Sequence, residues 1–259
     1  MSADELRAAA GPTSLDAMRL ALMPARAGRA GYAARLVLAG AVAAAATGTA
    51  GCAINTGQPG GGRVQLVSAL ADRLERAGSL TYTAAYRLPQ GDTATISQAQ
   101  NPGRAAYTYP GGKLILTPGA TADCRTQDSV TTCTLTAPPS PGTDPATALV
   151  DGIAVRGVIA PVVVIGLLTA AALDADALVT THDTTLAGQS ATCVDIQGVR
   201  DAASSEFDVC VTPDGVLASF AGTVAGAHVD IHLDRYDQIV APDAFDLPPG
   251  ATIIDQRAK

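Results

Sequence analysis

The stretch Leu80-Thr-Tyr-Thr-Ala-Ala-Tyr-Arg-Leu88 decides the fold class, because apolar side chains recur at every second position from Leu80 to Leu88. A period of two places such side chains on one face of a β-strand. Tyr82 and Tyr86 are on that face, and Thr83 and Arg87 are on the opposite one. The sequence therefore predicts a strand with one buried face.

Turn signals follow this strand at short intervals and divide the chain into hairpins. Working outward, they are Pro89-Gln-Gly-Asp92, Asn101-Pro-Gly103 and Pro110-Gly-Gly112. Glycine and proline supply the backbone angles that tight turns require. Strand patterns resume between residues 179 and 236, where Pro213-Asp-Gly215 is typical of a hairpin turn. The two sets of strands predict antiparallel meanders.

Helical periodicity precedes the first set of strands and separates it from the second. Residues 64–74 repeat apolar side chains at helical spacing, and Gly78 is placed to end that helix. Residues 153–173 carry one charge, Arg156, and are interrupted by Pro161, which predicts two short helices with this proline opening the second. A membrane span is the competing interpretation, but it needs about 20 consecutive apolar residues.

The N-terminus has the pattern of an export signal. Basic residues up to Arg35 precede an apolar run over residues 36–46, and small residues then lead into Thr49-Ala50-Gly51-Cys52. This last stretch resembles the lipobox of bacterial lipoproteins, which implies cleavage before Cys52 and a diacylglycerol on its thiol. An ordinary secretory signal and an uncleaved membrane anchor remain as alternatives.

These patterns divide the chain into three segments. Residues 1–51 are expected to be the signal peptide, which is overlong unless Met18 or Met23 is the true start. Residues 52–63 contain a run of glycines and predict a lipidated flexible tether. Residues 64–259 are expected to form a single globular domain.

The cysteines support export and predict two disulfides. Five cysteines leave one unpaired, and lipidation of Cys52 accounts for the odd one. The four others predict local bridges, Cys124 to Cys133 and Cys193 to Cys210. The second pair is favoured independently, because both of its cysteines share their strand faces with acidic residues and point away from the apolar side.

The order of helix, strands, helices and strands resembles the LolA/LprG-like lipoprotein fold, and Asp246-Leu-Pro-Pro-Gly250 resembles the ends of actinobacterial lipoproteins. The resemblance implies an α+β, mainly β domain. In it, a curved antiparallel half-barrel would carry the N-terminal helix and the central apolar helices on its concave face. It also implies an apolar cup for acyl chains. We expect this ligand cavity to be lined by Tyr82, Tyr86, Val158, Val162, Ile165, Leu168 and Leu173. The four disulfide cysteines are not typical of these families.

The charge and the motifs argue against several classes of function. Residues 52–259 contain 12 basic and 21 acidic side chains, a net charge of −9, which disfavours nucleic acid and anionic lipid surfaces as electrostatic partners. Gly188-Gln-Ser-Ala-Thr192 lacks the second glycine of a nucleophile elbow, and no cysteine pair has two-residue spacing. We expect no enzymatic activity and no cofactor.

A weak metal site is the exception. His228, Asp230 and His232 alternate along a predicted strand, so they share one face and could bind zinc or copper. The simpler interpretation is that Val229 and Ile231 face the core while the polar set faces water. It is favoured, because no fourth ligand is recognisable.

Three functions follow in order of preference. The first is a lipoprotein on the outer face of the cell membrane that binds a lipid or another apolar ligand, as a carrier. The second is an accessory envelope lipoprotein with a filled core that binds a protein partner. The third is an enzyme with an unrecognised site. An apolar cavity would favour the first function, and a packed interior with an exposed apolar patch would favour the second.

Overall fold

The computed structural model describes residues 61–138 and 152–257, which fall within one compact unit of the chain. The predicted signal peptide, most of the tether and Cys52 lie outside the described residues. Within the described ranges, no helix is long and apolar enough to cross a membrane.

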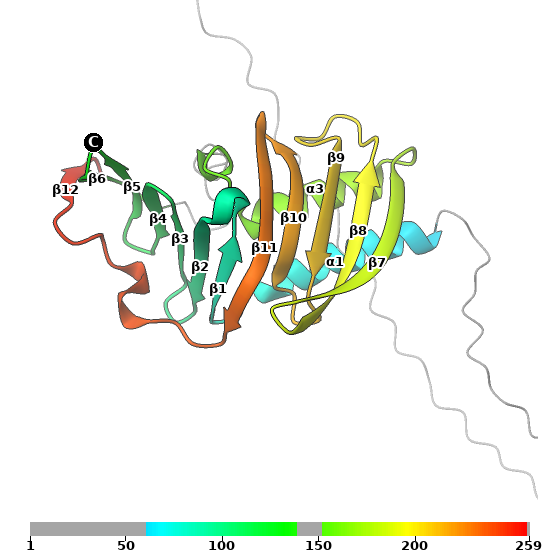
Figure 1. The fold of residues 1–259 in the computed structure, drawn as a ribbon, viewed down its shortest axis with the longest axis horizontal. Coiled ribbons are helices and arrows are strands. Elements are labelled where there is room, and N and C mark those ends of the chain that lie inside the picture. Colours follow the sequence, from blue (N-terminus) through cyan, green and yellow to red (C-terminus); the bar gives the residue numbers. More distant parts are fainter. Residues whose placement is uncertain (1–60, 139–151, 258–259) are drawn as a thin grey trace, which may run out of the picture. The chain divides into compact units, whose positions relative to one another are not determined.

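The described part of the chain is built on a single sheet of twelve strands (Figure 1). In chain order the strands are β1 Tyr82–Arg87, β2 Thr93–Ala99, β3 Arg104–Tyr109, β4 Gly112–Leu116, β5 Thr121–Gln127, β6 Val130–Thr136, β7 Leu178–Leu186, β8 Gln189–Gln197, β9 Glu206–Val211, β10 Leu217–Val224, β11 Ala227–Asp237 and β12 Thr252–Asp255. Their order across the sheet is β12-β6-β5-β4-β3-β2-β1-β11-β10-β9-β8-β7. The prediction of a mainly β domain is confirmed.

The sheet joins the two meanders at its centre, where β1 pairs with β11. Neighbouring strands are antiparallel except at one edge, where β12 pairs with β6 in parallel. The prediction of a purely antiparallel sheet is therefore wrong at this edge. A parallel pair requires a long connection, and the whole second half of the chain provides it.

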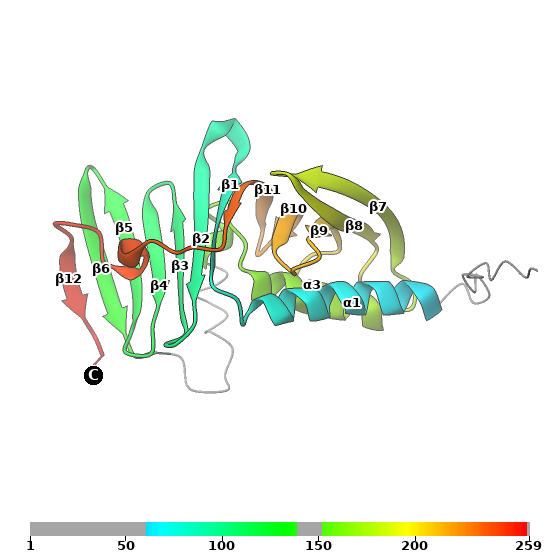
Figure 2. The same cartoon turned by 90° about the horizontal axis from the view of Figure 1, so that it is seen from below.

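Two helices lie across one face of the sheet (Figure 2). They are α1 Gly61–Ala77 and α3 Pro161–Leu173, and α3 opens with proline at its first helical position as predicted. The helices pack on each other and on the sheet in one core cluster. At the end of α1, the side-chain amide of Gln98 donates to the carbonyl oxygens of Ala77 and Gly78, at 2.9 and 2.8 Å. These bonds hold the end of α1 close to the end of β2.

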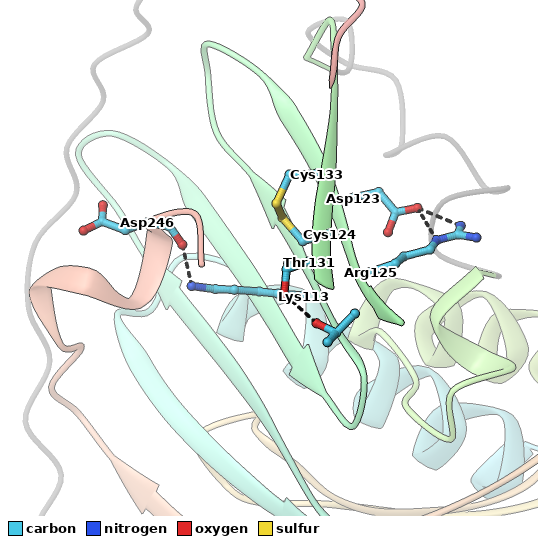
Figure 3. Close-up of a disulfide and its surroundings, with 8 residues drawn as sticks. Lys113, Asp123, Cys124, Arg125, Thr131, Cys133 and Asp246 are labelled. Carbon is cyan, nitrogen blue, oxygen red and sulfur yellow. Dashed lines mark hydrogen bonds and ion pairs between the residues drawn. A yellow bond between two sulfur atoms is a disulfide. The ribbon is translucent and has the colours of Figure 1, made fainter. Parts of the chain in front are cut away.

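The C-terminal segment covers part of the opposite face. A short 3-10 helix, Pro242–Phe245, precedes β12, and Phe245 and Leu247 pack on a cluster that includes Cys124 and Cys133. Lys113 donates to the main-chain oxygen of Asp246 at 2.7 Å (Figure 3). The segment around Pro248 crosses the face of the sheet, and β12 then extends the edge.

Candidate binding surface

The interior beneath the helices is the first place to look for the predicted lipid cavity. Tyr82, Tyr86, Val158 and Leu168 are at most 2% exposed, and all belong to the main core cluster. The hydroxyl of Tyr86 donates to the carbonyl oxygen of Leu217 at 2.9 Å, a buried hydrogen bond. Burial raises the pKa of Tyr86 well above its ordinary value. The structure therefore brings these four residues together as packed core.

Of the other three predicted cavity residues, Val162 and Ile165 pack partly against this cluster and Leu173 lies outside it. Val162 and Ile165 are only half-buried, and Leu173 is 83% exposed. They lie on the side of α3 opposite Val164 and Leu168, which face the sheet and α1. Helix α3 is apolar on all sides, so its sequence could not indicate which side would face outward.

Both predicted disulfides are present. Cys124 joins Cys133 between β5 and β6, and Cys193 joins Cys210 between β8 and β9. Each lies on the sheet face opposite the helices, where it forms part of a small apolar cluster. The face assignment from the acidic neighbours of Cys193 and Cys210 is confirmed.

The candidate metal ligands lie on the face of β11 opposite the core, as in the simpler interpretation of the sequence. Val229, Ile231 and Leu233 are buried, while His228 and His232 are exposed on the opposite face. His232 Nε2 lies 2.9 Å from Asp230 Oδ1. In the described ranges, the potential ligands that converge are His182, Cys193 and Cys210. Their two sulfur atoms are bonded to each other, so no free ligand set remains there.

Carboxylates make this outer face of β7 to β11 acidic. Asp195, Asp208 and Asp230 lie in one row across the sheet, with Ala221 between the last two. Burial raises the pKa of Asp208 above its usual value; His182 opposes this shift, and Asp195 adds to it. The negative charge of this face favours the binding of cationic groups.

Strand β7 ends this half of the sheet and pairs on its outer side with no strand of the described residues, although it also contacts β11. Most of its nine residues are exposed, and it contains neither lysine nor proline, the residues that commonly protect sheet edges. The hairpin to β8 turns through Ala187 and Gly188, both with positive φ, and is closed by Leu186 and Gln189. Between β7 and β8, hydrogen-bonded and non-hydrogen-bonded residue pairs alternate, starting from the hydrogen-bonded closing pair. The N–H and C=O groups of Thr181 and Thr185 therefore point to the open edge.

A polar groove lies at the other end of the sheet, on β5 and β6. Its volume is about 690 Å³, and it is lined by Thr121, Asp123, Arg125, Gln127, Asp128, Val130, Thr132, Thr134 and Thr136. Asp123 and Arg125, which are both on β5, form an ion pair at 2.7 Å in the lining of the groove (Figure 3). The groove differs in chemistry and position from the apolar cup that we expected.

Neither the β7 edge nor this groove was identified from the sequence. The residues of β7 were assigned to a strand, but the sequence pattern does not tell which strand of a sheet will be last. The groove forms where β5 pairs with β6. The residues that line it are mostly threonines and charged residues, which give no apolar pattern in the sequence.

Comparison with known proteins yields structural likenesses only. No family model and no curated protein matches the chain. An uncharacterized conserved protein from Thermus thermophilus aligns at 11% identity and a TM-score of 0.42, covering 74% of this chain and all of the other. The Pseudomonas aeruginosa MucA/MucB complex aligns at 15% identity and a TM-score of 0.40, covering 73% of this chain and 63% of that one. A DUF1329 family protein from Desulfovibrio piger gives 8% identity, a TM-score of 0.27 and coverages of 71% and 97%. These values carry no conclusion about function.

Proposed function

We propose that the chain is a lipoprotein of the outer face of the cell membrane, anchored through Cys52, whose domain binds an extended segment of a protein partner. The observation that carries the proposal is the open edge of β7. A strand of nine residues with exposed backbone donors and acceptors is a template for strand addition. The packed interior beneath α1 and α3 favours this function over lipid carriage.

The partner segment is expected to be extended and basic. Strand addition uses main-chain hydrogen bonds for affinity, and alternate side chains give specificity. The net charge of −9 over residues 52–259 and the row of carboxylates on β8, β9 and β11 attract lysine and arginine side chains.

Proline substitution in β7 tests whether a partner segment pairs with the open edge of this strand. The double variant Thr181→Pro, Thr185→Pro removes two N–H groups that point outward and leaves the pairing with β8 in place. At about 0.5–1.5 kcal/mol for each hydrogen bond, the loss is about 1–3 kcal/mol, which corresponds to about 5-fold to 150-fold in affinity. The matched control is Thr181→Ala, Thr185→Ala, which keeps both N–H groups.

The measurement is photo-cross-linking in intact cells from a photoreactive residue at position 183, with the same residue at position 130 as a second control. We expect one protein to be captured from position 183, to be retained in the alanine variant and to be lost in the proline variant. Equal capture by the alanine and proline variants, or from position 130, contradicts strand addition at β7.

The anchor is tested separately. The mature protein is expected to begin at Cys52 and to carry a diacylglycerol, whose two chains make membrane attachment stable where a single chain would be marginal. Intact-mass analysis of the membrane-extracted protein checks this, and Cys52→Ala should release the domain. An unmodified cysteine with cleavage upstream refutes the anchor without affecting the β7 edge.

Lipid carriage is the second candidate, and helix α3 is the observation in its favour. The helix has no charged residue, and its outer side is exposed although it is apolar. Lipid co-extracted with the protein and detected by native mass spectrometry would support carriage.

A further inference from the structure

Helix α3 has an apolar stripe on the side opposite its buried residues, and Val162 and Ile165 within this stripe still pack partly against the core. The stripe comprises Val162, Ile165, Gly166, Thr169 and Leu173, which follow one side of the helix at three- and four-residue spacing. The hydroxyl of Thr169 donates to the carbonyl oxygen of Ile165 at 2.7 Å, so its polar group is satisfied within the helix. No atom lies within 4 Å of the position that a Cβ on Gly166 would take. The α3 stripe is therefore without charge, and it is exposed at Gly166, Thr169 and Leu173.

The stripe ends beside the start of α1. Arg63, in the first turn of α1, donates to the carbonyl oxygens of Ala175 and Ala177, at 3.1 Å for Ala175. Leu173 precedes this pair of carbonyls and Leu178 follows it, and their exposed fractions are 83% and 66%. Leu178 thus adds a second exposed large apolar side chain, five residues after Leu173 and near the point where α1 begins.

Nearby acidic groups do not oppose this apolar surface. Asp174 and Asp176 flank the loop after α3, and both pair with Arg200, at 3.3 and 2.6 Å. Arg200 offsets one of their two negative charges, and Arg63, beside Ala175 and Ala177, supplies a second positive charge nearby.

The chain that precedes α1 indicates what covers the surface. Cys52 precedes Gly61 by nine positions, and nine residues span at most about 30 Å when fully extended. With a lipid on Cys52, the start of α1 and the adjacent Leu173 are held within that distance of the bilayer.

We infer that the α3 stripe, together with Leu178, is a membrane-contacting surface that lays the domain against the phospholipid bilayer to which Cys52 is anchored. The inference rests on the proposed anchor. An apolar helix face without basic residues adds little affinity by itself, but a lipid anchor keeps it at the bilayer, so that a few aliphatic side chains suffice to orient the domain. The surface lies at the α1 end of the sheet, and the β5–β6 hairpin lies at the other end (Figure 2).

A single tryptophan tests the inference, because the protein has none of its own. The variants are Leu173→Trp and Leu178→Trp in the membrane-contacting surface, and Val130→Trp as the matched control. Val130 is 60% exposed in the β5–β6 hairpin, so all three sites tolerate the larger side chain. Each membrane-extracted protein is placed in phosphatidylcholine vesicles with or without brominated acyl chains, after intact-mass analysis of the anchor.

Brominated lipid is expected to lower the emission of Leu173→Trp and Leu178→Trp by about half, because interfacial apolar faces lie about 5–10 Å deep, at the boundary of headgroups and acyl chains. The emission of Val130→Trp should not change. Unquenched emission from all three sites on an anchored protein overturns the inference and leaves the anchor standing, as does equal quenching of all three. Blue-shifted, unquenched emission at position 173 shows that protein rather than lipid covers this surface and also overturns it. A mass without diacylglycerol refutes the anchor and the inference together.

Discussion

Substitution of Leu168 by phenylalanine distinguishes a filled core from a lipid cavity. Leu168 is fully buried in the cluster that joins α3 to the sheet. Overpacking such a site costs about 1–3 kcal/mol. In a domain of about 200 residues, each kcal/mol lowers Tm by about 2–4 °C. We therefore expect Leu168→Phe to melt about 2–12 °C below the wild type.

The control for this experiment lies on the same helix. Val162 is half-exposed on the α3 stripe, so Val162→Phe should change stability by no more than about 0.5 kcal/mol. Thermal and urea unfolding followed by circular dichroism, with disulfides intact, measure both variants. If Leu168→Phe is as stable as the wild type, and lipid that co-extracts with the wild type is missing from the variant, the space at Leu168 is a ligand site and the filled-core reasoning is refuted.

Three further predictions concern stability. Gly215→Ala should cost about 1–2 kcal/mol more than Gly226→Ala by urea unfolding, because both have positive φ but a Cβ on Gly215 alone would overlap the main chain of α1. Burial raises the pKa of Tyr107 to about 12. The unfolded chain loses that proton near pH 10, so stability should fall as pH rises from about 10 to 12, and Tyr107→Phe should reduce the slope. Replacing Cys193 and Cys210 by alanine should lower the free energy of unfolding by about 3 kcal/mol, and an unchanged urea midpoint would contradict this.

Local chemistry made much of the fold predictable. The alternation around Tyr82 and Tyr86 places them on the buried face of β1, as expected. Pro161 at the start of α3 and the short-range disulfides were also predicted, because helix initiation and local cross-links depend on residues close in the sequence.

The remaining features depend on contacts between distant residues. The pairing of β1 with β11 spans more than half of the chain, and neither strand contains a residue that specifies its partner. Strand β12 has only four exposed residues, so no buried face marks it in the sequence. The outward side of α3 was assigned to a cavity because a helix that is apolar all round has no polar face by which to orient it.

The open edge of β7 and the membrane-contacting surface share Leu178, so the position of one surface limits the position of the other. This residue begins β7 and also belongs to the membrane-contacting surface. Strand β7 leaves the end of α3 and curves away from the helices (Figure 2), and a strand of nine residues rises about 30 Å. If α3 lies against the bilayer, the open edge of β7 therefore starts at the membrane and runs away from it. A segment that adds to β7 therefore begins at the bilayer surface. This geometry favours a partner that is itself membrane-bound, with its extended segment close to the membrane, over a partner that diffuses freely, because attachment of both chains to one bilayer raises their effective concentration.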